Sequence, residues 1–408
     1  MKIIFLILFS TLVSNAFAHR CGTTGYMKNA ASQFSVETDT LKNRDTLKDE
    51  VIIIPVVVHV LYHTSDQNIS DAQVLSQMNV LNNDYRRKNS DTINTPMPFK
   101  KVAADTRIQF CLAKVDPEGK YTTGIIHKST KQAKFFADDG MKFSSTGGDD
   151  AWDATKYLNI WVCNLSAEDS AEQTLAYTVL PGSPLEKDGV VIKYNVFGTI
   201  GNLYAPYDKG RTTTHEVGHW LGLKHLWGDT DCGDDGIADT PQQQKGNNGC
   251  PSFPHISSCS INSYGDMFMD FMDFTNDACM NMFTEGQKAE MRSLFALGHP
   301  RNSFLNSIVC DSSNAEGGPL PKDSSTTLKI ITYPNPFNNV INIVANTDSG
   351  IVGKILKIYS ISGQLCLSKI IQSQRTILNV SNLPAGIYIL KIAGNKSESV
   401  YKLIKVAE

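Results

Sequence analysis

The 408-residue chain has little net charge and few long apolar segments. Its formal charge is −3, only 19% of its residues are charged, and lysine and arginine form no basic run. No strong field therefore favours nucleic acid or an anionic membrane. After residue 18, no segment is apolar over a length that could cross a bilayer. We expect neither a nucleic-acid partner nor a transmembrane anchor.

The first 18 residues predict a secretory signal peptide. Lys2 precedes an almost continuous apolar run over residues 3–13, and Ala16 and Ala18 form a small-residue cleavage pattern. The run is too short for a membrane span, and polar sequence follows it. We therefore expect a secreted protein that begins near His19, with attachment to the cell surface left open.

Nine cysteines fit an oxidising compartment, and four of them lie in one loop-rich stretch. These four, Cys232, Cys250, Cys259 and Cys279, predict two disulfides, although their spacing leaves three pairings open. The other cysteines are compatible with free, buried thiols.

Apolar patterns between residues 51 and 310 predict a mixture of strands and helices. Residues 51–62 are β-branched and predict a buried strand, with further strands at 107–115, 157–164, 175–180 and 189–194. A capping-box pattern at Ser70 and Gln73 predicts a helix to about residue 87. Helices are also predicted at 211–224 and 284–297, where the second begins with Thr284 and Gln287. These elements predict an α+β domain.

The flanking segments differ in composition from this domain. Residues 19–50 are polar with little periodicity and predict a pro-segment or flexible leader, and residues 311–328 predict a linker. Residues 329–408 contain short alternating strands separated by turn signals and predict an all-β sandwich. The main domain then covers residues 51–310.

One predicted helix carries three histidines and a glutamate. His215 and His219 are four residues apart, so a helix places both rings on one face, where they can bind one metal ion. Gly222 can adopt a positive φ and end the helix, which lets His225 approach as a third ligand. Three neutral imidazoles leave the fourth position of a tetrahedral zinc ion open for water, the arrangement of a catalytic site.

Glu216 follows the first histidine and can reach that water without binding the metal. We expect it to act as general base in the hydrolysis of peptide bonds, because zinc acidifies its water and polarises a carbonyl. Two alternatives are hydrogen-bonded core histidines and a structural zinc site, which usually closes the fourth position with cysteine or histidine. A third is a zinc-bearing surface adhesin without turnover, against which the intact Glu216 argues.

The full pattern from residue 215 to residue 225 resembles the metzincin signature H-E-x-x-H-x-x-G-x-x-H. Residues 270–274 resemble its Met-turn, and residues 271–287 resemble the pappalysin family. The resemblance covers about residues 51–310. It implies a twisted mixed sheet with active-site and backing helices, a zinc endopeptidase activity, and Met272 as a floor beneath the histidines. The family usually has tyrosine where this chain has Phe274, so we expect Phe274→Tyr not to lower activity.

The resemblance also implies structural roles for the loop-rich stretch. Family disulfides cross, which would pair Cys232 with Cys259 and Cys250 with Cys279. The family has a calcium-binding loop, and the corresponding segment of this chain offers hard oxygen ligands. The alternative interpretation is that these acidic residues form turns exposed to solvent. Its candidate calcium ligands are Asp234, Asp235, Asp239 and Thr240.

Two further residues acquire roles from the same resemblance. Arg20, Cys21 and Gly22 resemble a cysteine switch, in which a thiolate occupies the open zinc position and keeps the enzyme latent; an incidental cysteine is the alternative. Related enzymes prefer arginine after the cleaved bond and use an acidic residue beyond the Met-turn, for which Asp277 is the candidate, unless it lies in an exposed loop.

The C-terminal segment, residues 329–408, resembles a type IX secretion sorting domain. The stretches at residues 333–337 and 383–388 and the basic end at residues 402–405 carry this resemblance. It implies export by the type IX secretion machinery. A carbohydrate- or protein-binding β-module is the alternative, because similar sandwiches have many functions.

Overall fold

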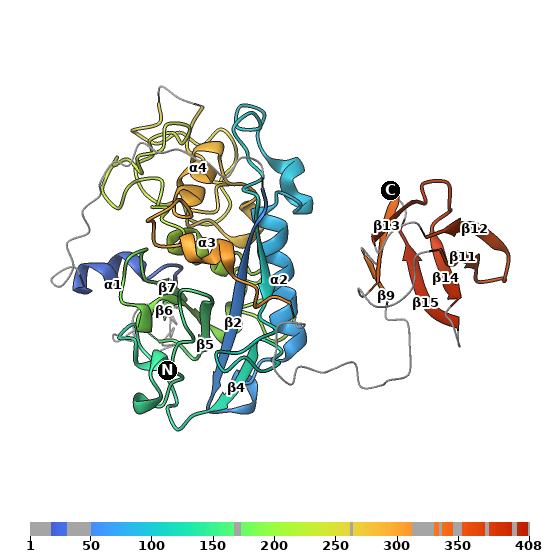
Figure 1. The fold of residues 1–408 in the computed structure, drawn as a ribbon. Coiled ribbons are helices and arrows are strands. Elements are labelled where there is room, and N and C mark those ends of the chain that lie inside the picture. The colour runs from blue at the N-terminus through green and yellow to red at the C-terminus, as the bar shows by residue number, and fades with distance from the viewer. Residues whose placement is uncertain are drawn as a thin grey trace, which may run out of the picture. The chain divides into compact units, whose positions relative to one another are not determined.

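The computed structural model describes residues 18–30, 50–166, 173–261, 264–311, 330–333, 337–345, 353–371, 375–393 and 398–406. The chain divides into two compact units, Met1–Gly318 and Pro319–Glu408 (Figure 1). Residues 1–17 of the predicted signal peptide and residues 312–328 of the predicted linker lie outside the described residues. None of the described helices is both long and apolar enough to cross a membrane.

A mixed β-sheet forms the centre of the first unit. Its strand order is β3-β2-β5-β8-β7, and β4 pairs with the far half of the long strand β2. All pairs are parallel except β7 with β8, which leaves β7 as an antiparallel edge strand. The strands are β2 (Ile52–Tyr62), β3 (Ile108–Leu112), β4 (Ile125–Ser129), β5 (Leu158–Cys163), β7 (Ala176–Thr178) and β8 (Gly189–Lys193). The expected strands are confirmed with shorter bounds, and β4 was not predicted.

Both faces of this sheet are buried. Ile54, Val56 and Val58 of β2 pack into the main core together with the helices α2 (Asp71–Tyr85) and α3 (Arg211–Trp220). Val57 and Leu61 point to the opposite face and join two smaller clusters beneath loops. Because side chains alternate along a strand, burial on both faces requires the continuous apolar run of residues 51–62.

The helices begin where their capping residues predict. Ser70 accepts a hydrogen bond from the backbone N–H of Gln73, but the Gln73 side chain donates to the carbonyl of Phe197 and does not complete a capping box. Thr284 and Gln287 form the complete capping box of α4 (Glu285–Ser293). The ends were predicted too late, since α2, α3 and α4 stop at residues 85, 220 and 293.

The described part of the leader, residues 18–30, contains regular structure. Strand β1 (Ala18–His19) pairs in parallel with β6 (Gln173–Thr174), and helix α1 (Thr23–Ala30) follows and contacts β7 (Figure 1). Eight residues are too few for a stable isolated helix, so α1 depends on its contacts with the main domain. Short 3-10 helices connect other elements at Ser65–Gln67, Ser90–Asn94, Gly140–Lys142, Ser144–Thr146, Leu185–Lys187, Tyr194–Val196, Asp277–Cys279 and Asn302–Asn306.

Three disulfides close the loops of the first unit. The structure pairs Cys232 with Cys259 and Cys250 with Cys279, the crossed arrangement that the family resemblance implies. Cys111 is paired with Cys310, so the expectation of free thiols is wrong for these two residues. It holds for Cys163, which is buried and free, while Cys366 is free and exposed.

The second unit is a β-sandwich by its described residues. One sheet has the order β13-β10-β9 and the other β12-β11-β14-β15. Apolar residues of both sheets share one core, including Ile343 of β10 and Ile358 of β11. Its strands are β9 (Ile330–Tyr333), β10 (Val340–Ala345), β11 (Ile355–Ser360), β12 (Leu365–Ile370), β13 (Arg375–Asn379), β14 (Gly386–Ala393) and β15 (Glu398–Lys405).

Candidate metal centre

Helix α3 and the turn after it bring the three predicted histidines together. His215 and His219 lie one turn apart on α3, and Gly222 has a φ of +88°, the left-handed conformation that the sequence predicts. The chain then turns back, so that His225 faces the other two rings. The three Nε2 atoms are 3.0, 3.1 and 3.2 Å from one another.

Each histidine is held in the same tautomer by a partner at its other ring nitrogen. The Nδ1 of His215 donates to the carbonyl of Phe271 at 2.7 Å, and that of His219 donates to the carbonyl of Leu223 at 2.8 Å. The Nδ1 of His225 faces the carboxylate of Asp229 at 2.5 Å. In a neutral imidazole whose proton is on Nδ1, the lone pair that can bind a metal is on Nε2.

This donor set fits a zinc ion. Burial, followed by the neighbouring rings, lowers the pKa of His219 to about 3 and that of His215 well below its usual value, so both are neutral. Three lone pairs at these separations repel one another unless a cation lies among them. Zn–N bonds of about 2.0–2.1 Å in a tetrahedral site separate two nitrogens by roughly 3.3 Å, close to the spacing found here.

The Met-turn lies directly beneath this group. Met272 is fully buried, and a Cβ atom added to Gly218 would lie only 2.5 Å from its sulfur. The helix can therefore approach the Met-turn only because a glycine separates the first two histidines along the chain. The preceding residue, Phe271, supplies the carbonyl that orients His215.

Two aromatic side chains enclose His225. The Trp227 ring stacks flat on the imidazole, with centroids 4.6 Å apart and an interplanar angle of 2°. Phe274 meets the same imidazole edge-on at 4.7 Å and lies 5.7 Å from His215. Phe274 therefore lies at the position next to the histidines that the resemblance indicated, without a hydroxyl to donate.

The leader enters this centre. The ligand atoms of Cys21 and the three histidines all lie within 4.8 Å of one another, and Cys21 is buried. Thr23 donates to Glu216 Oε2 at 2.8 Å, and Thr178 of β7 donates its backbone N–H to Thr23 Oγ1 at 3.0 Å. Burial raises the pKa of Glu216 to about 8, although Cys21 and Thr23 lower it in part. The structure thus describes a leader-bound state.

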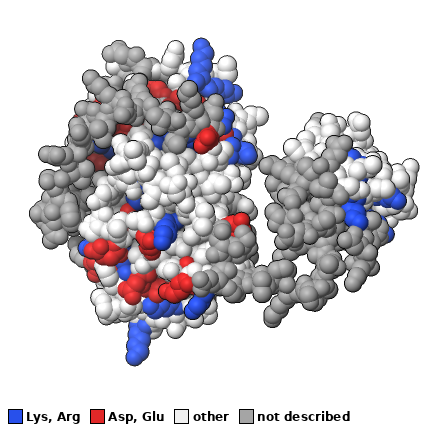
Figure 2. All heavy atoms as spheres, viewed as in Figure 1, with Lys and Arg blue, Asp and Glu red and all other residues white. Residues whose placement is uncertain are grey.

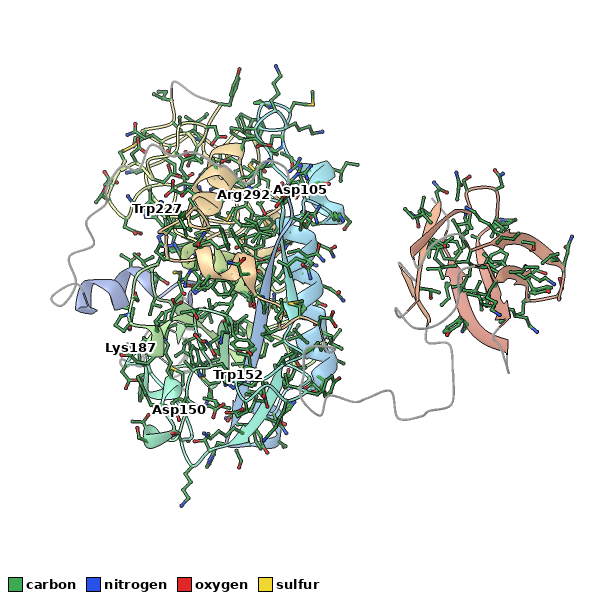
Figure 3. The ribbon with its side chains drawn as sticks, viewed as in Figure 1. Asp105, Asp150, Trp152, Lys187, Trp227 and Arg292 are labelled. Carbon is green, nitrogen blue, oxygen red and sulfur yellow. A yellow bond between two sulfur atoms is a disulfide. The ribbon has the colours of Figure 1, made fainter. Side chains whose placement is uncertain are left out.

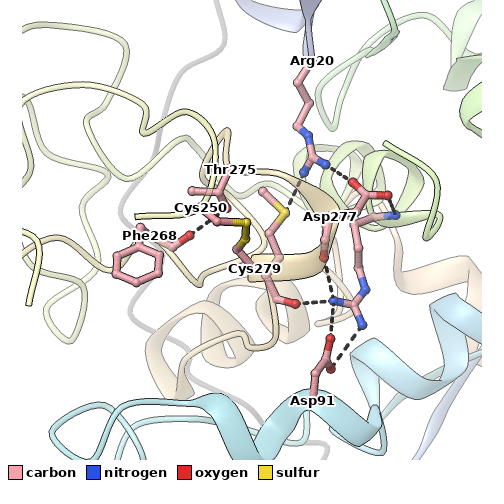
Figure 4. The surroundings of a disulfide bond; sticks show 9 residues. Arg20, Asp91, Cys250, Phe268, Thr275, Asp277 and Cys279 are labelled. Atoms are coloured by element: carbon pink, nitrogen blue, oxygen red, sulfur yellow. Dashed lines mark hydrogen bonds and ion pairs between the residues drawn. A yellow bond between two sulfur atoms is a disulfide. The ribbon is translucent and has the colours of Figure 1, made fainter. Parts of the chain in front are cut away.

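Asp277 lies where the leader's Arg20 ends. The Arg20 guanidinium forms an ion pair with Asp277 (Figure 4) and contacts the sulfur of Met280 at 2.6 Å. It also lies over the ring of Tyr207. The other carboxylate oxygen of Asp277 accepts from the backbone N–H groups of Lys209 and Arg211, at 2.8 and 3.2 Å. Asp277 is therefore buried at the start of α3 and not in an exposed loop.

The residues of the predicted calcium loop have protein partners. Asp235 accepts from Thr240 at 2.8 Å, and Asp239 accepts from Thr284 and from the N–H of Gly286 at the start of α4. Asp234 accepts from the N–H of Gly236. Among the described residues, these carboxylates do not form a metal-binding cluster of the kind found at the histidines. Calcium binding stays a prediction.

Several residues at the centre were not predicted. Asp229 lies four residues after His225, and this helix-like spacing beside a metal-ligand candidate was the signal that could have found it. Trp227 and Thr23 carried no comparable signal, because their contacts depend on how the irregular segment and the leader fold.

Comparison with known proteins identifies two families along the chain. The family described as pregnancy-associated plasma protein-A matches residues 143–296, and the family described as secretion system C-terminal sorting domain matches residues 331–406.

On the visible face of the first unit, acidic and basic side chains are interspersed around a broad uncharged area (Figure 2). No large field of one sign appears on that face.

Relatives and solved structures agree with the first of these families. An extracellular metalloprotease of Arthroderma benhamiae is 30% identical over 262 residues, which cover 62% of this chain and 75% of that protein. Mature mirolysin of Tannerella forsythia, solved with a cleaved peptide, is 49% identical with a TM-score of 0.60, covering 64% of this chain and 97% of that chain.

Promirolysin of the same organism is 44% identical with a TM-score of 0.63, covering 70% of this chain and 96% of that chain. The expected fold, a mixed sheet with active-site and backing helices followed by an all-β domain, is confirmed. The chain therefore belongs to the pappalysin family of zinc metalloproteases, and it is a secreted enzyme with a C-terminal sorting domain.

Proposed function

We propose that this enzyme is an endopeptidase in which His215, His219 and His225 hold the zinc ion and Glu216 is the general base. The observation that carries the proposal is the convergence of three Nε2 atoms, each on a ring whose Nδ1 is fixed by an oxygen. Such second partners are typical of histidines that bind a metal. A structural zinc site is less consistent with this arrangement, because its fourth ligand here would belong to the leader.

The mechanism assigns proton transfer to Glu216. A zinc ion at the three histidines would supply a Lewis acid that polarises the scissile carbonyl and acidifies a water molecule. The carboxylate of Glu216, which directly follows His215 on α3, would accept a proton from that water and deliver it to the departing amine. In the leader-bound state Glu216 Oε2 accepts from Thr23 instead, so this carboxylate is engaged.

The Arg20 site supports a preference for arginine after the scissile bond. It offers a buried carboxylate, a thioether and an aromatic face to a guanidinium, and two backbone N–H groups fix the carboxylate. An arginine side chain of a substrate would find the same three partners once the leader has left the cleft.

The position of Cys21 supports latency by the leader. A thiolate within reach of the ion would occupy the position that water needs, and Arg20 and Thr23 on either side would hold the leader at Asp277 and Glu216. We assign the C-terminal domain to export by the type IX secretion machinery, in keeping with its family match. The proposal also includes a calcium ion in the irregular segment, where hard oxygen ligands lie close together in sequence at Asp234, Asp235, Asp239 and Thr240.

The proposal is tested by Glu216→Gln together with the control Glu290→Gln, which changes an exposed glutamate on α4. We expect casein cleavage by the processed Glu216 variant to fall by about 10²–10⁴-fold, since a general base contributes about this much. Zinc content should stay at one ion per chain in both variants. Cleavage at the wild-type rate by the Glu216 variant would refute the assignment.

A further inference from the structure

A second anchor holds the leader beyond the metal centre, at a buried ion pair. Tyr26 of α1 contacts Asp139, Lys142 and Tyr177, and Lys187 borders the same place (Lys187 is labelled in Figure 3). We call this group of four main-domain residues the Tyr26 site. None of the four has a role in the mechanism proposed above.

The Tyr26 site matches both parts of a tyrosine side chain. The Tyr26 hydroxyl donates to Asp139 Oδ2 at 2.6 Å, and its ring lies 4.9 Å from that of Tyr177. The Lys142 ammonium is 5.7 Å above the Tyr26 ring. The site therefore combines an acceptor for the hydroxyl with an aromatic and a cationic neighbour for the ring.

The acceptor is fixed before any tyrosine arrives. Asp139 Oδ1 is bound by Lys142 at 2.8 Å and by the hydroxyl of Tyr177 at 3.0 Å, so it is already satisfied. Asp139 Oδ2, by contrast, has Lys187, at 3.2 Å, as its one partner besides Tyr26 among the described residues. Burial alone would raise the pKa of Asp139, but the Lys142 ammonium and the Tyr26 hydroxyl hold it below its usual value. The carboxylate is thus ionised and keeps one oxygen directed at Tyr26.

The leader also shows on which side of the scissile bond this site lies. Along the leader, Arg20 is at Asp277, Cys21 is at the histidines, and Tyr26 is at Asp139. The Tyr26 site is therefore across the centre from the place proposed for the arginine that follows the bond. Tyr177 belongs to the edge strand β7, whose Ala176 carbonyl and Thr178 N–H already pair with the leader.

After the leader has left, an extended peptide can use the same Ala176 carbonyl and Thr178 N–H by adding a strand to this sheet edge. Because its arginine follows the bond, such a peptide would run in the direction opposite to the leader. Because Thr178 is linked through Thr23 to Glu216, Tyr177 lies close to the catalytic carboxylate along β7. With a rise of about 3.3 Å per residue, a substrate reaches this place two or three residues from the reacting carbonyl.

We propose that the Tyr26 site is a substrate subsite that binds a tyrosine side chain two or three residues before the scissile bond, after the leader has left. The inference rests on the proposed function, since it requires a cleft that cleaves before arginine. It adds a second determinant of specificity on the opposite side of the bond.

The site should distinguish tyrosine from phenylalanine. Phenylalanine would fill the same space but leave Asp139 Oδ2 without the buried hydroxyl donor of tyrosine. Because a hydrogen bond to a charged group contributes substantially to the binding free energy, we expect kcat/KM to differ roughly tenfold or more between the two residues. Leucine and alanine would also lose the aromatic contact, so their kcat/KM should be lower again.

The test uses the full chain after it has lost its leader, with the mature N-terminus mapped, and peptides that carry arginine after the bond. The second and third residues before the bond are set in turn to tyrosine, phenylalanine, leucine or alanine. We expect tyrosine at one of these positions to raise kcat/KM about tenfold over phenylalanine. Equal cleavage with all four residues at both positions would overturn the inference, whereas no cleavage of any peptide would overturn the proposed function itself.

Variants connect the preference to the site. Asp139→Asn should reduce the ratio of tyrosine to phenylalanine cleavage to near one, and the exposed neighbour Asp138→Asn should leave the ratio unchanged. Because Asp139 is buried beside Lys142, its variant could fail to fold; the wild-type peptide series then decides the matter alone. A ratio that stays near ten in folded Asp139→Asn would reject Asp139 as the acceptor.

Discussion

The Asp229 carboxylate lies 2.5 Å from Nδ1 of His225, while Trp227 covers one face of the same ring at 4.6 Å. His225 is the candidate ligand that lies beyond the end of α3, in a segment without regular structure. The helix therefore does not fix its ring as it fixes His215 and His219. Asp229 and Trp227 supply that restraint.

We expect Asp229→Ala to weaken zinc binding by about 10–100-fold, because loss of a histidine's second partner typically has this effect. The measurement is competition for zinc with a chelator of known affinity, which does not depend on turnover. Asp231→Ala, an exposed aspartate in the same turn, is the control. Equal zinc affinity of the Asp229 variant and wild type would show that Trp227 and the backbone orient His225 without the carboxylate.

Latency should depend on Cys21 more than on the other free cysteines. Loss of a charge-assisted contact worth about 1.5–3 kcal/mol would raise the open fraction of the leader by roughly 10–100-fold. We expect Cys21→Ala to cleave a short peptide before the leader is removed, with Cys366→Ala behaving as wild type. Mass spectrometry of the intact chain must accompany the assay. A Cys21 variant as inactive as the wild-type zymogen would assign latency to Arg20 and Thr23.

The arginine preference should depend on the charge of Asp277. We expect Asp277→Asn to lower the kcat/KM ratio of arginine to leucine after the scissile bond by roughly 10–100-fold, since one charged partner of the guanidinium is lost. Asparagine keeps an oxygen for the N–H groups of Lys209 and Arg211 at the start of α3. An unchanged preference in the peptide profile would remove Asp277 from the specificity site.

Phe274→Tyr should not lower activity. The Phe274 ring lies beside His225 and His215, and a side chain at Gly246 would collide with it, since an added Cβ would lie 2.9 Å from the ring. The pocket is therefore shaped around an aromatic ring, and a hydroxyl at its end would add a donor near the centre. The comparison of kcat/KM for the two enzymes checks this, and a large fall in the variant would contradict it.

The histidines could be predicted from the sequence because local geometry fixes them. The four-residue spacing on a helix and the positive φ of Gly222 depend on few residues, and both are found. Contacts between residues far apart in the sequence could not be predicted in the same way. The Cys111–Cys310 disulfide joins residues 199 positions apart, and no spacing rule covers such a pair.

The helix in the leader could not be predicted for a related reason. Residues 23–30 have little apolar periodicity of their own, and their helix is held by Thr23 at Glu216 and by Tyr26 at Asp139. A helix that forms only against the surface of the main domain leaves no clear periodic pattern in its own sequence. Strand β4 was missed similarly, because its residues are mostly half-buried and pair only with the end of β2.

The Asp139–Lys142 pair should make the stability of the first unit depend on pH. Burial opposes ionisation of Asp139, but Lys142 and the neighbouring donors keep its folded-state pKa below the usual value of about 3.9. An acid of this kind stabilises the fold above its unfolded pKa, and the contribution is lost as the pH falls through the lower, folded value.

Asp139→Asn should therefore lower the unfolding free energy by about 3–5 kcal/mol at pH 7, where it leaves Lys142 buried without its partner. Thermal unfolding of wild type and variant between pH 7 and pH 3 checks this, with Asp138→Asn as the control. We expect the difference in Tm to shrink below about pH 4, and a difference that is constant over this range would mean that Asp139 is not an ionised partner of Lys142.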